Sequence, residues 1–324
     1  MKQDDAMFLE LIREVRIGEL LKGDGDKRYE ASGVCEKEGY LHIVFDNDPH
    51  LLRIRPDWHR AGENPSLINL KGTATGYEDI TFQSSAGRWY CLIEAAETKS
   101  GVYMPRVDAF DESFAFIKSY WLDFPLKAGN KGFEGLATLR SAGDEYLLGL
   151  CEGNKCKSGR AGKKPGKGRI QVFKKDGETW AHTGTIRLPE AVRFEDYSSL
   201  DCRNGLLTVI SQTSSAMWIG RLLLEPAEQP VPKSPHSLVV SSRSDDLLQF
   251  ADNGRLYLFP RNDKGRIIYG NLEGVTWLGN DRLVVVSDKV KADQPKRCAR
   301  KDQSVHIFRQ PAAGLPTDLI FWKS

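Results

Sequence analysis

A short motif that returns five times along the chain is the feature that most constrains the fold. Each copy has an aromatic residue or leucine, then glutamate, then a small or acidic residue. It continues into two apolar stretches separated by a polar turn of the Gly, Asn and Asp type that joins the strands of a β-hairpin. The copies begin as YEASG, YEDIT, FEGLA, FEDYS and LEGVT, with their glutamates at Glu30, Glu78, Glu134, Glu195 and Glu273.

The spacing of the copies indicates a repeat architecture. Successive motif glutamates lie 48, 56, 61 and 78 residues apart. Propeller blades repeat at about 40–50 residues, so the later units must carry insertions. Further strand-like stretches follow the hairpins, among them MPRVDAF, GRIQVFKKDG, AMWIGRLLLEP and GRLYLFP. Four strands per unit, repeated around a circle, is the layout of a β-propeller.

We therefore predict an all-β fold, a single β-propeller domain over residues 1–324 with five four-stranded blades. The last unit has SVHIFRQP as its third strand and no obvious fourth strand. The N-terminal stretch REVRIGELL, residues 13–21, is expected to supply that strand, which would join the chain ends and remove a free sheet edge. The alternative is six blades, with a degenerate blade hidden within 225–270.

Composition and charge narrow the function classes. The 324 residues carry 46 basic and 44 acidic side chains, a net charge of +2 that indicates neither nucleic acid nor a membrane surface as a partner. The N-terminus has acids within its first five residues and does not resemble a secretory signal. No apolar run is long enough to span a bilayer, so we expect a cytoplasmic protein with no membrane partner.

The six cysteines are expected to be reduced thiols in that compartment. The only close pair, Cys151 and Cys156, has a C-x4-C spacing with no second pair and no nearby histidine, which argues against zinc.

The motif glutamates are expected to meet at one mouth of the central channel, because the first strand of each propeller blade lines that channel. The second strand runs antiparallel and returns to the same mouth. Its end carries an acid in four units and serine, Ser211, in the fourth. The four rim acids are Asp46, Glu94, Glu152 and Asp288.

Carboxylates that converge in this way repel one another unless a cation neutralises them. Oxygen-rich clusters suit a hard cation, and calcium before magnesium, because calcium accepts six to eight oxygen ligands in irregular geometry. The five motif glutamates are thus candidate calcium ligands. The alternative is structural, in which each glutamate caps backbone N–H groups of the neighbouring blade and holds the blades together.

Two basic loops are expected at the same mouth, because both follow a second strand. One is GNKCKSGRAGKKPGKGR, residues 153–169, and the other is KVKADQPKRCARK, residues 289–301. Lysine, arginine and glycine in such density favour phosphate or another anion, although the same loops could simply be solvated. The candidate anion-binding residues are Lys163, Lys164, Lys167, Arg169, Lys289 and Arg297.

Catalytic motifs are otherwise scarce. The chain has no G-x-S-x-G, H-E-x-x-H, G-x-G-x-x-G or Walker A sequence. The four rim acids are the candidates for a general base, and His50 and His59 are weaker ones.

At EASGV, FEGLA and NLEGVTWLGNDRLVVVSDK the chain resembles the phytase-like bacterial propellers. These include the group described as esterase-like activity of phytase and the SdiA-regulated type. The resemblance implies a propeller with calcium at its channel mouth and, in true phytases, calcium-bridged phosphate hydrolysis. By motif position, the family's metal-ring role falls on Glu78, Glu134, Glu195 and Glu273. Glu30 is a looser match, because Ser32 could occupy the equivalent place.

Two functions remain from this reasoning. The first is a calcium-dependent hydrolase of a phosphorylated or other anionic ester, with calcium polarising the ester and the basic loops holding the anion. The second is a non-catalytic propeller that binds a small ligand or a protein at the same mouth, with structural calcium.

Overall fold

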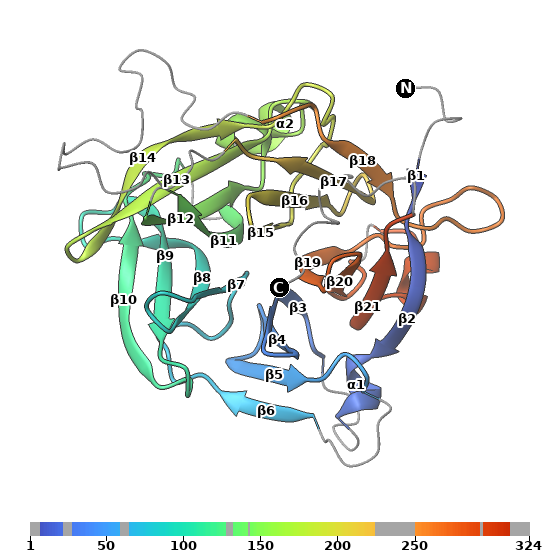
Figure 1. The fold of residues 1–324 in the computed structure, drawn as a ribbon, viewed down its shortest axis with the longest axis horizontal. Coiled ribbons are helices and arrows are strands. Elements are labelled where there is room, and N and C mark those ends of the chain that lie inside the picture. Colours follow the sequence, from blue (N-terminus) through green and yellow to red (C-terminus); the bar gives the residue numbers. More distant parts are fainter. Residues whose placement is uncertain are drawn as a thin grey trace.

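The computed structural model describes residues 7–21, 28–58, 65–127, 132–141, 143–223, 250–291 and 294–311. They form an all-β protein whose strands are arranged radially about a central axis, as in a propeller (Figure 1). No helix in these ranges is long and apolar enough to cross a bilayer. The helices there are short: α1 (Ile17–Leu20), η2 (Asn154–Cys156), α2 (Gly159–Gly162) and η3 (Lys296–Arg300).

The strands follow one another as antiparallel meanders, numbered here from the first to the fifth. The first is β3 (Ala31–Lys37), β4 (Tyr40–Phe45), β5 (His50–Ile54) and β6 (Ser66–Asn69). The second is β7 (Ile80–Gln83), β8 (Arg88–Glu97), β9 (Tyr103–Phe110) and β10 (Phe116–Leu122). The third is β11 (Phe133–Ser141), β12 (Asp144–Cys151), β13 (Arg169–Asp176) and β14 (Thr179–Arg187). The fourth is β15 (Ser199–Arg203), β16 (Leu206–Ser211), β17 (Ala216–Arg221) and β18 (Arg255–Leu258). The fifth is β19 (Leu272–Leu278), β20 (Arg282–Ser287) and β21 (Ser304–Arg309), completed by β2 (Glu10–Arg16).

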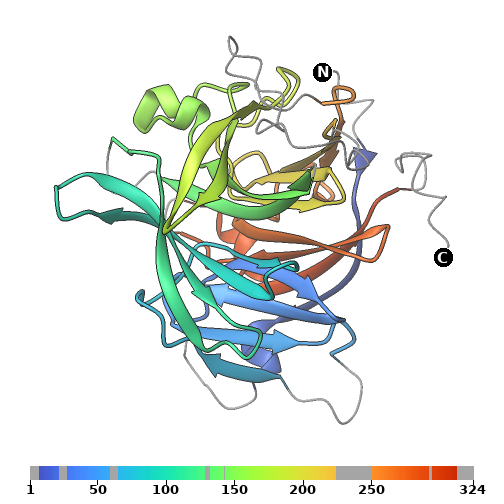
Figure 2. The ribbon, with the colours of Figure 1, turned by 60° about the vertical axis from the view of Figure 1, so that its left-hand side comes forward.

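The second and third meanders are joined into one eight-stranded sheet. Their outer strands β10 and β14 run parallel, and Trp121 and Leu122 pair with Thr179 and Trp180. Figure 2 shows these outer strands, green and yellow-green, meeting at one side of the molecule. The hydrogen bonding therefore gives four sheets, although the chain makes five successive meanders.

The N-terminal segment closes the fifth meander, as predicted. Strand β2 runs antiparallel to β21, with Glu10 opposite Arg309 and Arg16 opposite Ser304. The predicted strand over 13–21 is too long, because the chain turns into α1 after Arg16 and buries Ile17 completely in the core. A second short strand, β1 (Met7–Phe8), pairs in parallel with β18 of the fourth meander.

The sixth blade weighed over 225–270 falls partly outside the described residues. Within the described part, 250–270, the chain forms β18 and the loop that leads to β19. Residues 224–249 are not described.

The core is divided among the interfaces between neighbouring meanders. Each interface has its own cluster of buried apolar side chains, and the cluster between the fifth and first meanders closes the circle. Trp89 of β8 and Val44 of β4 belong to one such cluster, for example, and Trp218 of β17 and Leu148 of β12 belong to another. Because each sheet is covered on both faces, a second strand such as β16 is buried at all of its positions and reads as a continuous apolar run.

The inner strands approach closely at the axis, and glycine permits this. A Cβ at Gly274 would lie 2.9 Å from Cα of Gly33, and one at Gly33 would lie 2.5 Å from Cα of Asp79. The glycine that follows the motif glutamate in FEGL and LEGV is thus a packing requirement of the narrow centre.

Replacing Gly33 by alanine is expected to destabilise the protein by about 1–3 kcal/mol, because the added methyl group meets backbone atoms that cannot move aside. Gly18→Ala is the matched control, since a Cβ there has nothing within 4 Å. Urea unfolding followed by tryptophan fluorescence measures both variants. Equal midpoints for the two variants would contradict the packing argument.

Candidate functional site

The motif position in each meander is a β-bulge at the start of the innermost strand. In three meanders, one residue of the innermost strand has no partner on the second strand, although the residues on either side of it are paired. These residues are Ser32 in β3, Glu134 in β11 and Glu273 in β19. In the second meander, Glu78 and Asp79 both bond the backbone of Leu92. Because a bulge adds one residue to a strand, it re-aims that side chain, here at the end of the strand where the acids gather.

Serine takes this bulge position in two meanders, while the predicted ligands Glu30 and Glu195 lie two and three residues before it. In the first meander it is Ser32 rather than Glu30, and in the fourth it is Ser198, whose N–H and whose neighbour Ser199 both pair with Ile210. Each hydroxyl donates to a backbone carbonyl of the following meander. Ser32 Oγ bonds the oxygen of Tyr77, and Ser198 Oγ lies 2.7 Å from the oxygen of Leu272.

The acids of the mouth gather in two groups of three. Within each group, one carboxylate oxygen from every member lies within 4.8 Å of the others. The first group draws on the first and fifth meanders, and the second group on the second and third. The first is Glu30, Asp46 and Asp288, and the second is Glu94, Glu134 and Glu152.

Antiparallel pairing of first and second strands explains both groups. Ala31 pairs with Phe45, and Phe133 with Cys151, so each motif segment lies beside the residue that follows the second strand. The rim acids therefore reach the mouth as expected, and all four belong to one of the two groups.

Three of the five motif glutamates lie outside the two groups. Glu78 is close enough to Glu94, Asp46 and Glu152 for their charges to raise its pKa. Glu273 is buried, and its Oε1 lies 3.9 Å from Nζ of Lys291. Glu195 is exposed on the approach to β15.

Burial and mutual repulsion raise the pKa values of these carboxyl groups. Desolvation, followed by the charges of neighbouring acids, raises the pKa of Glu78 to about 8 and that of Asp46 to about 7. Desolvation raises the pKa of Asp288 to about 6. The pKa values of Glu134 and Glu273 are also raised well above their usual range, mainly by burial. A site of this kind favours bound protons or a bound cation at neutral pH.

The alternative role, capping of neighbouring N–H groups, belongs to other residues. Asp79 accepts a bond of 2.9 Å from the N–H of Leu136, and Asp201 accepts one of 2.9 Å from the N–H of Trp277. Both aspartates thereby tie one meander to the next. Within the described ranges, no motif glutamate side chain accepts a bond from a backbone N–H of a neighbouring meander. In the sequence, only the position of Asp79 directly after the motif glutamate in YEDIT pointed to this role.

A cavity of about 270 Å³ opens beside the second carboxylate group, and Glu152 belongs to both. The loop between β12 and β13 forms one wall, and buried Asn154 anchors that loop by donating from Nδ2 to the carbonyls of Gly162, Phe194 and Glu195. The cavity is lined by Glu152, Gly153, Lys157, Ser158, Gly159, Gly162, Lys163, Glu195, Asp196, Gln212, Thr213 and Lys291.

Of the predicted anion-binding residues, only Lys163 lines this cavity. Lys167 pairs with Glu190 at 3.3 Å, and Arg297 lies in a separate hollow, where its Nε donates to Ile267. Lys164, Arg169 and Lys289 do not line the cavity.

Sequence reasoning missed Lys157 and Lys291. Both belong to the two basic loops that it named, but charge density in a loop cannot say which side chains face inward.

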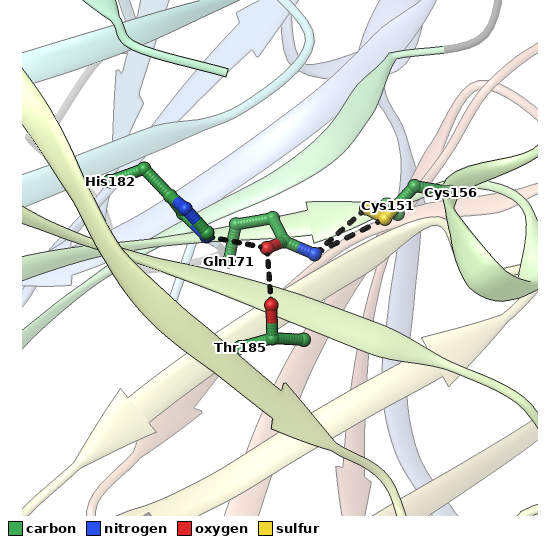
Figure 3. Close-up of a disulfide and its surroundings, with 5 residues drawn as sticks. All are labelled: Cys151, Cys156, Gln171, His182 and Thr185. Atoms are coloured by element: carbon green, nitrogen blue, oxygen red, sulfur yellow. Dashed lines mark hydrogen bonds between the residues drawn. A yellow bond between two sulfur atoms is a disulfide. The ribbon is translucent and has the colours of Figure 1, made fainter. Parts of the chain in front are cut away.

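The expectation of reduced thiols is wrong for one pair, because Cys151 and Cys156 form a disulfide (Figure 3). The turn at η2, with positive φ at Cys156, folds the chain back and brings the two Cα atoms to 5.1 Å. Gln171 Nε2 lies 3.2 Å from Cys156 Sγ, while its Oε1 accepts from Thr185 and contacts His182. The remaining four cysteines, Cys35, Cys91, Cys202 and Cys298, are free.

Reducing this disulfide is expected to lower stability by about 2 kcal/mol, the value for a bridge closing a short loop. For a chain of this length, the melting temperature should fall by about 3 °C. Thermal melts with and without a phosphine reductant measure the difference. The double variant Cys151→Ser with Cys156→Ser should not respond to the reductant, and an unchanged wild-type melt would contradict the prediction.

Of the two histidines considered as general bases, the structure describes only His50. His50 Nδ1 lies 2.5 Å from Oδ1 of buried Asp48, which fixes the orientation of the ring. His59 lies outside the described residues.

Comparison with known proteins gives similarity in fold only. No protein-family model matches the chain, and no curated protein matches it. The phytase-like resemblance therefore stays a prediction.

Several solved structures are similar over nearly the full length of both chains. A glutaminyl cyclase from Myxococcus xanthus shares 11% identity, with a TM-score of 0.48, over 94% of this chain and 97% of the other. The β-xylosidase RS223 shares 11% identity, with a TM-score of 0.49, over the same shares of the two chains. A PQQ-bound aldose sugar dehydrogenase from Streptomyces coelicolor shares 10% identity, with a TM-score of 0.45, over 93% and 97%.

Proposed function

We propose that this protein is a five-bladed propeller that binds calcium at its channel mouth and holds an anionic ligand in the adjoining cavity. The eight-stranded sheet counts as two blades, because each half has its own innermost strand, β7 or β11, at the axis. A buried core cluster also separates the two halves.

The two groups of three carboxylates carry the metal proposal. Each offers only carboxylate oxygens, which suits calcium better than zinc or copper. Backbone carbonyls and water could complete a coordination number of six to eight. Calcium would be held by Glu30, Asp46 and Asp288 in one group and by Glu94, Glu134 and Glu152 in the other.

The lysines of the cavity carry the ligand proposal. Lys157, Lys163 and Lys291 line it together with three glycines, whose backbones a ligand can approach closely. An ammonium group binds phosphate as a point charge, so a phosphate ester or a small carboxylate fits this lining. A small anion is thus the proposed ligand, rather than nucleic acid.

For a hydrolase, the bound metal would supply polarisation of the ester and activation of a water. The chain itself would orient the anion through Lys157 and Lys163 and accept the proton of the water. Glu195 is the proposed base, since it lines the cavity and belongs to neither carboxylate group.

The non-catalytic alternative is favoured by one observation. All four rim acids that sequence reasoning named as bases, Asp46, Glu94, Glu152 and Asp288, belong to the proposed metal groups. If these rim acids serve the metal and Glu195 does not act as a base, the protein would bind its ligand without turnover.

Elemental analysis and calorimetry of protein purified without added metal test this proposal. We expect two calcium ions per chain, with magnesium binding more weakly. Turnover of p-nitrophenyl phosphate or p-nitrophenyl acetate that requires calcium and falls at least tenfold in Glu195→Gln would support the hydrolase. Calcium binding without turnover would leave the binding propeller, and no calcium binding would overturn both.

A further inference from the structure

Lys291 connects the carboxylates of the mouth with the cavity. It follows β20 in the loop that leads to η3, and 57% of its side chain is exposed. Its Nζ lies 3.9 Å from Oε1 of Glu273, and the same side chain lines the cavity beside Lys157 and Lys163. Glu152 of the second carboxylate group lines this cavity too, so one ammonium group borders both the site proposed for a cation and the site proposed for an anion.

The other basic residues of the cavity do not share this position. Among the residues that the structure describes, Lys291 is the one basic side chain that forms an ion pair with a motif glutamate. Its charge also acts on Asp46, Glu78 and Asp288, where it opposes the effect of their burial. Lys291 is therefore placed as the internal counter-ion of the mouth.

A single ammonium group cannot neutralise both sides at once. Without metal, the combined negative charge of the mouth attracts it, because charges a few ångströms apart at a partly buried site interact much more strongly than in bulk water. A divalent cation bound to the carboxylates would compete for the same negative charge and weaken that attraction. The exposed part of the side chain leaves it free to turn toward the cavity.

We infer that Lys291 is a shared counter-ion that couples the two sites, pairing with the mouth when metal is absent and with the anion in the cavity when metal is bound. The inference rests on the proposed function. Calcium should then increase the affinity for the anion, and the anion should increase the affinity for calcium by the same factor, as linkage requires. A factor of about 5–30 is within the usual range of such coupling.

Isothermal titration calorimetry with calcium chloride and with methylphosphonate, a phosphate-like dianion without an ester bond, tests the coupling. In the wild type, methylphosphonate should bind about 5–30-fold more tightly when calcium is saturating. In Lys291→Met, calcium should bind more tightly than in the wild type, because its internal competitor is gone. The affinity of this variant for methylphosphonate should change less than twofold when calcium is added.

Two variants serve as controls. Lys289→Met removes a charge from the same loop, but Lys289 makes its contacts through its backbone, so it should behave as the wild type. Lys291→Arg retains the positive charge and should retain the coupling. The comparison with Lys291→Met then shows whether the lost coupling results from the lost charge or from disturbed folding.

The failures are distinguishable. If Lys291→Met binds calcium with the affinity of the wild type, and calcium still tightens its binding of methylphosphonate, the role of Lys291 is overturned. The metal proposal would stand. Absence of calcium binding in the wild type would overturn the metal proposal and this inference together.

Discussion

In the absence of metal, the protein is expected to lose stability as the pH rises from 5 to 8, and calcium is expected to restore it. The pKa values of Asp288, Asp46 and Glu78 are raised to about 6, 7 and 8, above their ordinary values of 3.8, 3.8 and 4.5. Between the ordinary and the raised values, the folded protein binds more protons than the unfolded chain. Stability therefore falls with increasing pH across this window and is highest below it.

Calcium should act most strongly at the alkaline end of that window, because it binds ionised carboxylates. A ligand at about 100 times its dissociation constant stabilises the folded state by about 2.7 kcal/mol per site. For a chain of this length, two sites should raise the melting temperature by about 8 °C at pH 8 and by much less at pH 5.

Thermal melts over this pH range, with EDTA or with excess calcium, give the measurement. Potassium chloride at matched ionic strength controls for screening, which should account for only part of the effect. A melting temperature that does not change with pH in EDTA, or that ignores calcium at pH 8, would contradict the prediction.

The second large effect is expected from Glu134→Gln. The substitution removes one carboxylate from the second group while keeping the size of the side chain. Without metal, the variant should be more stable than the wild type at pH 8, by about 1 kcal/mol or more, because the repulsion among the remaining acids falls. With calcium, the order should reverse, because one binding site has lost a ligand.

Calorimetry should show one calcium ion fewer per chain for Glu134→Gln, with the other ion unaffected. Asp46→Asn is the counterpart in the first group and should remove the other ion. The double variant should bind none and should not respond to EDTA. If Glu134→Gln lowers stability equally with and without calcium, Glu134 has a purely structural role.

The motif itself predicted more of the fold than of the site. FEGL and LEGV place a glutamate at the bulge and a glycine at the crowded axis, so in both copies the motif coincides with the bulge. YEASG and FEDYS also contain an aromatic residue and a glutamate, but the bulge falls on the serine of ASGV and of YSSL. Spacing along a sequence cannot separate these registers, because the choice depends on which residue faces the neighbouring meander.

The loops illustrate the same limit. Their charge indicated an anion site, yet Lys157, Lys163 and Lys291 line the cavity, while Lys167 pairs with Glu190 and Arg297 lies elsewhere. A lysine in a glycine-rich loop can face either side, and the anchoring of Asn154 to the fourth meander decides the outcome. The Cys151–Cys156 bridge depends likewise on a turn that the spacing of the two cysteines does not reveal.

The sequence by itself determined an all-β repeat fold, the N-terminal strand that closes it, and the rim acids at the ends of the second strands. These features follow from local rules, since strand periodicity, hairpin turns and antiparallel return act between near neighbours in the chain. Only the tertiary structure decided that the acids divide into two groups, that a serine takes the bulge position in two meanders, and that Lys291 lies between the mouth and the cavity. These depend on contacts between segments as distant as Glu30 and Asp288, which meet only when the circle of meanders closes.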